Sequence, residues 1–142
     1  MEKNILLSKY IIYGLIGICL EIFWTGLESL MQNNLTLEGT TYIWMFFIYG
    51  LAVFLEPFHE KIRDYNPLIR GSLYMIIIYC IELVTGLFLK ITLGNCPWNY
   101  AGNGIILSII TPRFIPVWFT LGLIFERVHD GLEDIIESKL KA

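Results

Sequence analysis

Four long apolar runs dominate this sequence and decide the solvent in which it can fold. They extend approximately over Tyr10–Leu30, Tyr42–Phe58, Ser72–Leu93 and Ile105–Phe125. Each run approaches the roughly 20 residues that a helix needs to cross a bilayer. Because a chain in lipid must satisfy its backbone polar groups internally, such runs are expected to be helices. The sequence therefore predicts an all-α integral membrane protein with four spans.

The composition agrees with a lipid environment. Of the 142 residues, 56% are hydrophobic and 16% are charged, and the mean hydropathy is +0.62. Soluble domains have about 45–50% apolar and about 25% charged residues. The first run carries Glu21 and no small-residue cleavage pattern follows it, so we do not expect a removable signal peptide. We expect a single transmembrane domain over residues 1–142, with spans at about 10–30, 42–62, 71–93 and 105–130 and an amphipathic cytoplasmic tail at 131–142.

Basic residues predict the orientation. They gather before the first span, between the second and third spans, and after the fourth: Lys3, Lys9, Lys61, Arg63, Arg70, Lys139 and Lys141. Since Lys and Arg are retained on the cytoplasmic side, we predict a multi-pass protein of the cell membrane with both termini in the cytoplasm. The net charge of −3 and the lack of a basic stripe give no indication of a nucleic-acid partner.

The sequence also contains weak internal similarity. A shift of 61 residues places four residues on counterparts of the same kind: Lys9 on Arg70, Tyr13 on Tyr74, Cys19 on Cys80 and Glu21 on Glu82. A shift of 70 places Glu56 on Glu126, His59 on His129 and Glu60 on Asp130. Two similar helical hairpins are therefore predicted to form a four-helix bundle, as a parallel repeat whose axis runs along the membrane normal.

Each predicted span carries one glutamate, namely Glu21, Glu56, Glu82 and Glu126. Counting about 1.5 Å per helical residue from the nearest span end places all four at similar depth, from the middle to the inner half of the bilayer. A charge near the bilayer centre costs about 2.5–3.5 kcal/mol. We therefore expect the four carboxylates to face the bundle interior and to converge there.

The two histidines of the chain each follow a glutamate by three residues, in Glu56–His59 and Glu126–His129. Together with Glu21 and Glu82 they match the ligand inventory of di-iron and di-manganese carboxylate bundles. Pro57 argues against this, because it cannot donate to the carbonyl of Val53 and can bend the helix. The alternatives are helix-end capping or ion pairing, a relay for protons or substrate, and a bis-histidine haem that leaves the glutamates unexplained.

The predicted outer connections offer fewer candidates. Residues 104–111 are expected to be either a kinked extension of the fourth span or a short helix in the outer leaflet. Arg113 follows them and is a candidate contact for an anion, although an interfacial arginine is the commoner case. The sequence contains no Walker loop, no Gly-x-Ser-x-Gly and no Cys-x-x-Cys motif, and the three cysteines are expected to be free thiols.

Three segments carry a resemblance to a known family: "GLIGICLEIFW", "YIWMFFIYGLAVFLEP" and "PWNYAGNGIIL". They resemble the small four-span bacterial membrane family labelled "putative ABC transporter permease (type IV)". The matching positions are an acid in the first span, a Tyr-Gly pair in the second and a Trp-Asn-Tyr motif in the later outer loop: Glu21, Tyr49, Gly50, Trp98, Asn99 and Tyr100. The resemblance implies a transport role with an ABC-type ATPase as partner.

Two classes of function follow from these features. The first is a small permease-like membrane protein, not an enzyme, with an intramembrane site for cations or protons formed by Glu21, Glu56, His59, Glu82, Glu126 and His129. The second is a metal-dependent membrane oxidoreductase that uses the same residues to bind iron or manganese. A structural or accessory membrane subunit without a site is a further alternative. The expected partners are the lipid bilayer, an ATPase and a second copy of the chain.

Overall fold

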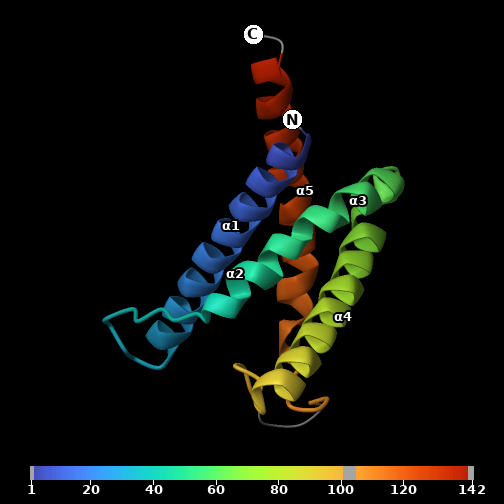
Figure 1. Cartoon of the computed structure of the whole chain (residues 1–142). Coiled ribbons are helices and arrows are strands. Elements are labelled where there is room, and N and C mark those ends of the chain that lie inside the picture. The colour runs from blue at the N-terminus through green and yellow to red at the C-terminus, as the bar shows by residue number, and fades with distance from the viewer. Residues whose placement is uncertain (1, 101–104, 141–142) are drawn as a thin grey trace. The chain divides into compact units, whose positions relative to one another are not determined.

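The computed structural model describes residues 2–100 and 105–140, which form helices and their connections (Figure 1). The β pairing within this part of the chain is an isolated bridge between Ile106 and Ile110. The chain divides into two compact units, residues 1–57 and 58–142, and each unit is described by itself. The prediction of an all-α protein is confirmed.

The first unit is a helical hairpin. Helix α1 (Glu2–Met31) packs against α2 (Ile43–Gly50) and the 3₁₀ helix η1 (Leu51–Leu55). Glycines permit this close contact, because a Cβ on Gly14 would lie 2.7 Å from the carbonyl oxygen of Phe46 and one on Gly50 would lie 2.6 Å from the Tyr10 ring. Small residues at such positions are typical of helices that associate within a membrane.

The second helical segment of this hairpin is not a uniform α-helix. After η1 the chain continues as α3 (Glu56–Ile62), whose first two residues belong to the first unit and whose remainder belongs to the second. Pro57 lies two residues beyond η1. Because proline has no N–H and its ring collides with the carbonyl of residue i−4, it removes the α-helical hydrogen bond to Val53, which lies within η1.

The second unit is also a helical hairpin. Helix α4 (Pro67–Leu93) begins where the Asn66 side chain accepts a hydrogen bond from the N–H of Ile69 at 3.0 Å. It ends at Gly94, whose φ of 76° is the left-handed cap that glycine adopts without strain. After the 3₁₀ helix η2 (Pro112–Phe114), α5 (Ile115–Leu140) packs against α4. The predicted tail at 131–142 is helical as far as it is described, since α5 continues to Leu140.

In both units the connection runs back along the first helix before the second helix begins. In the first unit, the Thr25 hydroxyl accepts from the N–H of Thr40 at 2.8 Å and donates to its carbonyl at 2.9 Å. In the second, the Tyr79 hydroxyl donates to the carbonyl of Thr111 at 2.8 Å, and Ile109 is fully buried beside Gly86. The second helix of each hairpin therefore starts part-way along the first one.

The structure of residues 105–111 differs from the predicted helical one. Neither a kinked extension of the fourth span nor a short helix is present in this range; the chain forms a turn with positive φ at Leu107 and Ser108. Residue 104 lies outside the described residues. Pro112 explains why no helix begins before residue 112, since the residue before a proline avoids the helical region. Thr111 is accordingly extended, with φ −132° and ψ 136°.

Two helices are long and apolar enough to cross a membrane, over Asn4–Met31 and Pro67–Leu93. Only 22% and 17% of their most apolar windows are buried, whereas the core helix of a soluble protein is mostly buried. Exposed side chains such as Phe23 (66%) and Ile91 (82%) would be covered by lipid tails. The segment α2–η1–α3 is interrupted, and α5 carries charged residues in its second half, so neither meets the same test. The arrangement with four spans and a repeat therefore stays a prediction.

Candidate functional site

The first unit holds Glu56 between a cation and a tyrosine from α1. Lys9 Nζ lies 2.8 Å from Glu56 Oε2, and the Tyr13 hydroxyl donates to Glu56 Oε1 at 2.8 Å. The Lys9 and Glu56 side chains are only 9% and 14% exposed. Lys9 and Tyr13 can serve one carboxylate because residues four apart lie on the same face of a helix.

The second unit holds Glu126 in a similar way. Arg70 Nε lies 2.9 Å from Glu126 Oε1, and the Tyr74 hydroxyl interacts electrostatically with the same carboxylate. Arg70 and Tyr74 are again four residues apart, on α4. The Arg70 guanidinium additionally donates to the carbonyls of Arg63 and Tyr65, at 2.9 and 3.1 Å, and so fixes the connection between α3 and α4. We call Glu56 and Glu126 the proximal carboxylates.

We call Glu21 and Glu82 the distal carboxylates. They lie on α1 and α4, farther along these helices than the basic and tyrosine partners of the proximal carboxylates. The Thr41 hydroxyl donates to Glu21 at 2.9 Å, in the connection that runs back along α1. Glu82 accepts from the Tyr100 hydroxyl and from the Trp118 indole N–H, both at 3.2 Å. The outer-loop residue Tyr100, singled out in the sequence, therefore belongs to the surroundings of Glu82.

The expectation that the glutamates share one depth is wrong within each unit. Glu21 lies eight residues beyond Tyr13, the partner of Glu56, and Glu82 lies eight beyond Tyr74. Eight residues of α-helix correspond to a rise of about 12 Å. The proximal and distal carboxylates of each hairpin are thus two separate sites. The estimate of a common depth assumed that the second helix of each hairpin starts level with the end of the first helix. In the structure the second helix starts part-way along the first one.

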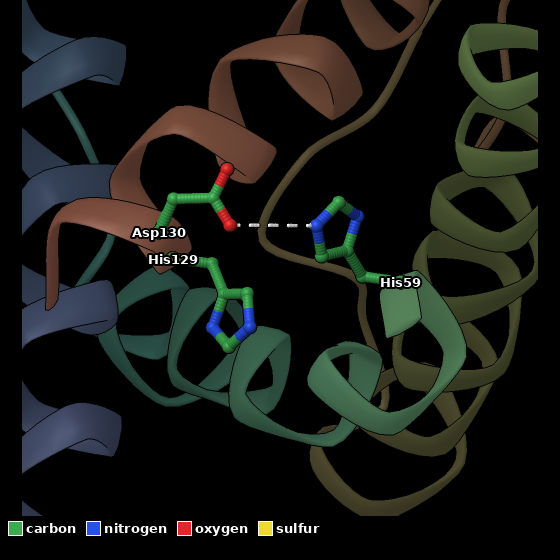
Figure 2. Close-up of side chains that lie close together, drawn as sticks. All are labelled: His59, His129 and Asp130. Carbon is green, nitrogen blue, oxygen red and sulfur yellow. Dashed lines mark ion pairs between the residues drawn. The ribbon is translucent and has the colours of Figure 1, made fainter. Parts of the chain in front are cut away.

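A cluster of three side chains from α3 and α5 is the strongest candidate site (Figure 2). This His cluster consists of His59, His129 and Asp130, and one ligand atom from each lies within 4.8 Å of those of the other two. His59 and His129 are 2% and 3% exposed, and their ring centroids are 5.3 Å apart. His59 and Asp130 point toward each other, with Nε2 and Oδ1 separated by 3.7 Å (Figure 2).

The surroundings of His59 link the cluster to Glu126. His59 Nδ1 lies 2.7 Å from the Tyr74 hydroxyl and 3.6 Å from Glu126 Oε1. A continuous chain of polar contacts therefore runs within the second unit, from Arg70 through Glu126 and His59 to Tyr74. His59 Nε2 has no hydrogen-bond partner among the residues that the structure describes.

Charged residues cover the outer edge of the cluster. The Arg63 guanidinium lies 2.7 Å from Glu60 and 2.8 Å from Asp130, and Glu60 lies 3.3 Å from His129 Nε2. Arg63 and Glu60 are 44% and 55% exposed at their side chains, so this edge is open to water. Hydrogen bonds to Glu60 and Asp130 raise the pKa of Arg63 above its usual range, so it remains a cation.

The predicted Glu-x-x-His pairs thus have partners beyond their own pair. His59 contacts Glu126 and Asp130 on α5, and Glu56 belongs to the first unit. Glu60 and Asp130 were missed as site residues, although the 70-residue shift that aligns the two histidines also aligns these two acids. The 61-residue shift likewise marked both helix partners of the proximal carboxylates.

The remaining candidates lie in the connection after α4 and in η2. Trp98 is 8% exposed, and Asn99 lines a small pocket with neighbours that include Lys90 and Cys96. Arg113 lies in η2, where its backbone N–H donates to the Thr111 hydroxyl at 3.5 Å. An anion contact at Arg113 stays a prediction.

A comparison with protein families matches most of the chain to one family. The family model described as "Putative ABC-transporter type IV" matches residues 8–141. This range includes all the carboxylates and histidines described above. No solved structure matches the chain.

Proposed function

Because the chain belongs to this ABC-transporter type IV family, we propose that it is a small permease-like membrane protein with a Glu/His site for cations or protons. The His cluster and Glu126 carry this proposal. They bring two imidazoles and two carboxylates together in the second unit, against the open edge formed by Glu60 and Arg63. Ionisable groups at membrane depth are costly, and they commonly mark the path of an ion or substrate.

We propose four spans and two equivalent hairpins as the frame for this site. Each hairpin pairs a proximal carboxylate with a cation and a tyrosine four residues apart. Each places its distal carboxylate twelve residues beyond the cation. This common spacing supports a parallel repeat, with both termini and the 59–71 connection in the cytoplasm as the basic residues predict.

The di-metal oxidoreductase receives less support. A two-metal cage needs ligands from four helices around one point, with the metals about 3.5–4 Å apart. In each unit, however, the distal glutamate lies about 12 Å along the first helix from the tyrosine beside the proximal carboxylate. Lys9 and Arg70 already neutralise the proximal carboxylates. A haem between the histidines is also disfavoured, because their ring centroids are only 5.3 Å apart. Rings this close leave no room for a porphyrin between them.

The family label is the basis for proposing an ABC-type ATPase as the partner. A suitable test uses inside-out membrane vesicles from cells that overproduce the chain, energised with ATP, so that a native ATPase remains associated. Fluorescent indicators then report movement of protons, Na⁺, Mn²⁺ and Zn²⁺.

We expect ATP-dependent movement of one of these ions that His59→Gln and Glu126→Gln abolish. Glu38→Gln, an exposed glutamate in the connection between α1 and α2, is the control and should retain it. Equal movement in all variants, or none in wild-type vesicles, would contradict the proposal.

A further inference from the structure

We propose that the His cluster binds a single divalent transition-metal ion, through His59 Nε2, one ring nitrogen of His129 and Asp130 Oδ1. This inference rests on the proposed cation site and names the chemical class of its ligand. The metal would be bound inside the second unit, between α3 and α5.

The ligand set and its spacing favour such an ion. Two imidazoles and one carboxylate form a common binding set for zinc and related ions, whereas Mg²⁺ and Ca²⁺ prefer oxygen ligands alone. Zinc–ligand bonds of about 2.0–2.2 Å place tetrahedral ligand atoms roughly 3.3 Å apart. The His59–Asp130 separation of 3.7 Å is already close to this value, and all three ligand atoms lie within 4.8 Å. Rotation of side chains brings them into range without moving the helices.

The buried ring nitrogen of His59 also favours a metal ion. The residue is 2% exposed, and its Nε2 is directed at Asp130 with no hydrogen-bond partner among the described residues. A buried ring nitrogen without a partner costs free energy, and a metal ion would satisfy it.

The contacts of the other ring nitrogen prepare His59 for this role. A metal-binding histidine usually donates its second N–H to an acceptor that fixes the tautomer. Here Nδ1 lies 2.7 Å from the Tyr74 hydroxyl and 3.6 Å from Glu126 Oε1, and Arg70 Nε holds that carboxylate at 2.9 Å. Donation from Nδ1 to Tyr74 leaves the lone pair of Nε2 available to a metal.

Arg63 occupies the place of a counter-cation. Its guanidinium bridges Glu60 and Asp130, and a metal on Asp130 would compete with it for the same oxygen. Because the Arg63 side chain is 44% exposed, it can turn into water when a metal enters. Glu60, released from Arg63 and already 3.3 Å from His129 Nε2, can then orient that ring. Arg63 therefore sets the affinity of the site.

The test is zinc binding by the full chain, purified in detergent through a tag without histidines. Calorimetry with ZnCl₂ and elemental analysis after dialysis should give one zinc per chain. His59→Gln and Asp130→Asn should each weaken binding at least tenfold, and Tyr74→Phe should weaken it roughly tenfold through loss of orientation. Asp134→Asn, four residues along α5 and exposed, is the matched control and should bind as the wild type does. Arg63→Gln should bind zinc more tightly.

Two outcomes overturn the proposal: no stoichiometric zinc on the wild-type protein, or equal loss in Asp130→Asn and Asp134→Asn. Far-UV circular dichroism of each variant separates loss of ligand from loss of fold, and the gain expected for Arg63→Gln cannot arise from misfolding. Zinc binding does not depend on transport. Binding without ion movement in vesicles would uphold the metal site and contradict the transport role, and proton movement without bound zinc would do the reverse.

Discussion

Gly14→Ala tests the packing of the first hairpin, because the structure leaves no space for a methyl group at this position. The added Cβ would lie 2.7 Å from the carbonyl oxygen of Phe46 and 2.8 Å from its ring. Ordinary contact begins near 3.4 Å, so α1 and α2 must separate by about 3.4 − 2.7 = 0.7 Å. Backbone cannot turn away as a side chain can. Overpacking of this kind costs about 1–3 kcal/mol.

The matched control is Gly131→Ala on α5, where an added Cβ would meet nothing within 4 Å. Both substitutions place alanine in a helix and gain about 0.5–1 kcal/mol from helix propensity. The difference between the two variants therefore isolates the steric cost.

Thermal unfolding of the detergent-solubilised protein, followed by tryptophan fluorescence, gives this difference. We expect Gly131→Ala to be at least as stable as the wild type, and Gly14→Ala to be less stable than Gly131→Ala by about 1–3 kcal/mol. If Gly14→Ala unfolds at the same temperature as Gly131→Ala or at a higher one, α1 and α2 do not pack as closely as the structure shows.

Three further predictions follow from the helix ends, the ion pair and the topology. Asn66→Ala should lower stability by about 1 kcal/mol, because it removes the cap of α4; an unchanged melting temperature would argue against that cap. Glu126→Gln should cost about 3 kcal/mol, because it leaves the buried part of Arg70 without its anion, and adding Arg70→Gln should restore part of the loss; strictly additive losses would mean that the pair is not coupled. With the native cysteines replaced by serine, Leu35→Cys should react with a membrane-impermeant maleimide outside intact cells and Tyr65→Cys should not; the opposite result would reverse the orientation.

Much of the helical structure could be predicted from local features. The apolar runs predicted α1 and α4 because these helices have long apolar sequences that need no tertiary information. Residues 105–114 read equally as part of an apolar span, yet the prolines at 112 and 116 and the fold-back of the chain leave them outside α5. Apolar composition alone cannot distinguish a helix from a connection that packs on one.

The candidate site was predictable in its residue types but not in its contacts. The repeat pattern identified His59, His129 and Glu126 without indicating which helices bring them together. The sequence spacing suggested that each histidine works with the glutamate three residues before it. In the structure, His59 contacts two acids of α5, Glu126 and Asp130, instead of the glutamate three residues before it. Such contacts depend on the register between helices, which the connections determine.

The most direct measurement on the proposed site is X-ray absorption at the zinc edge of the zinc-loaded protein. The spectrum distinguishes nitrogen or oxygen neighbours at about 2.0–2.2 Å from sulfur at about 2.3 Å, and it detects the outer-shell scattering of imidazole rings. We expect two imidazoles and additional oxygen ligands in the wild type, and one imidazole at most in His129→Gln. A spectrum with a sulfur ligand, or one without imidazole, would place the metal elsewhere and contradict the site at His59, His129 and Asp130.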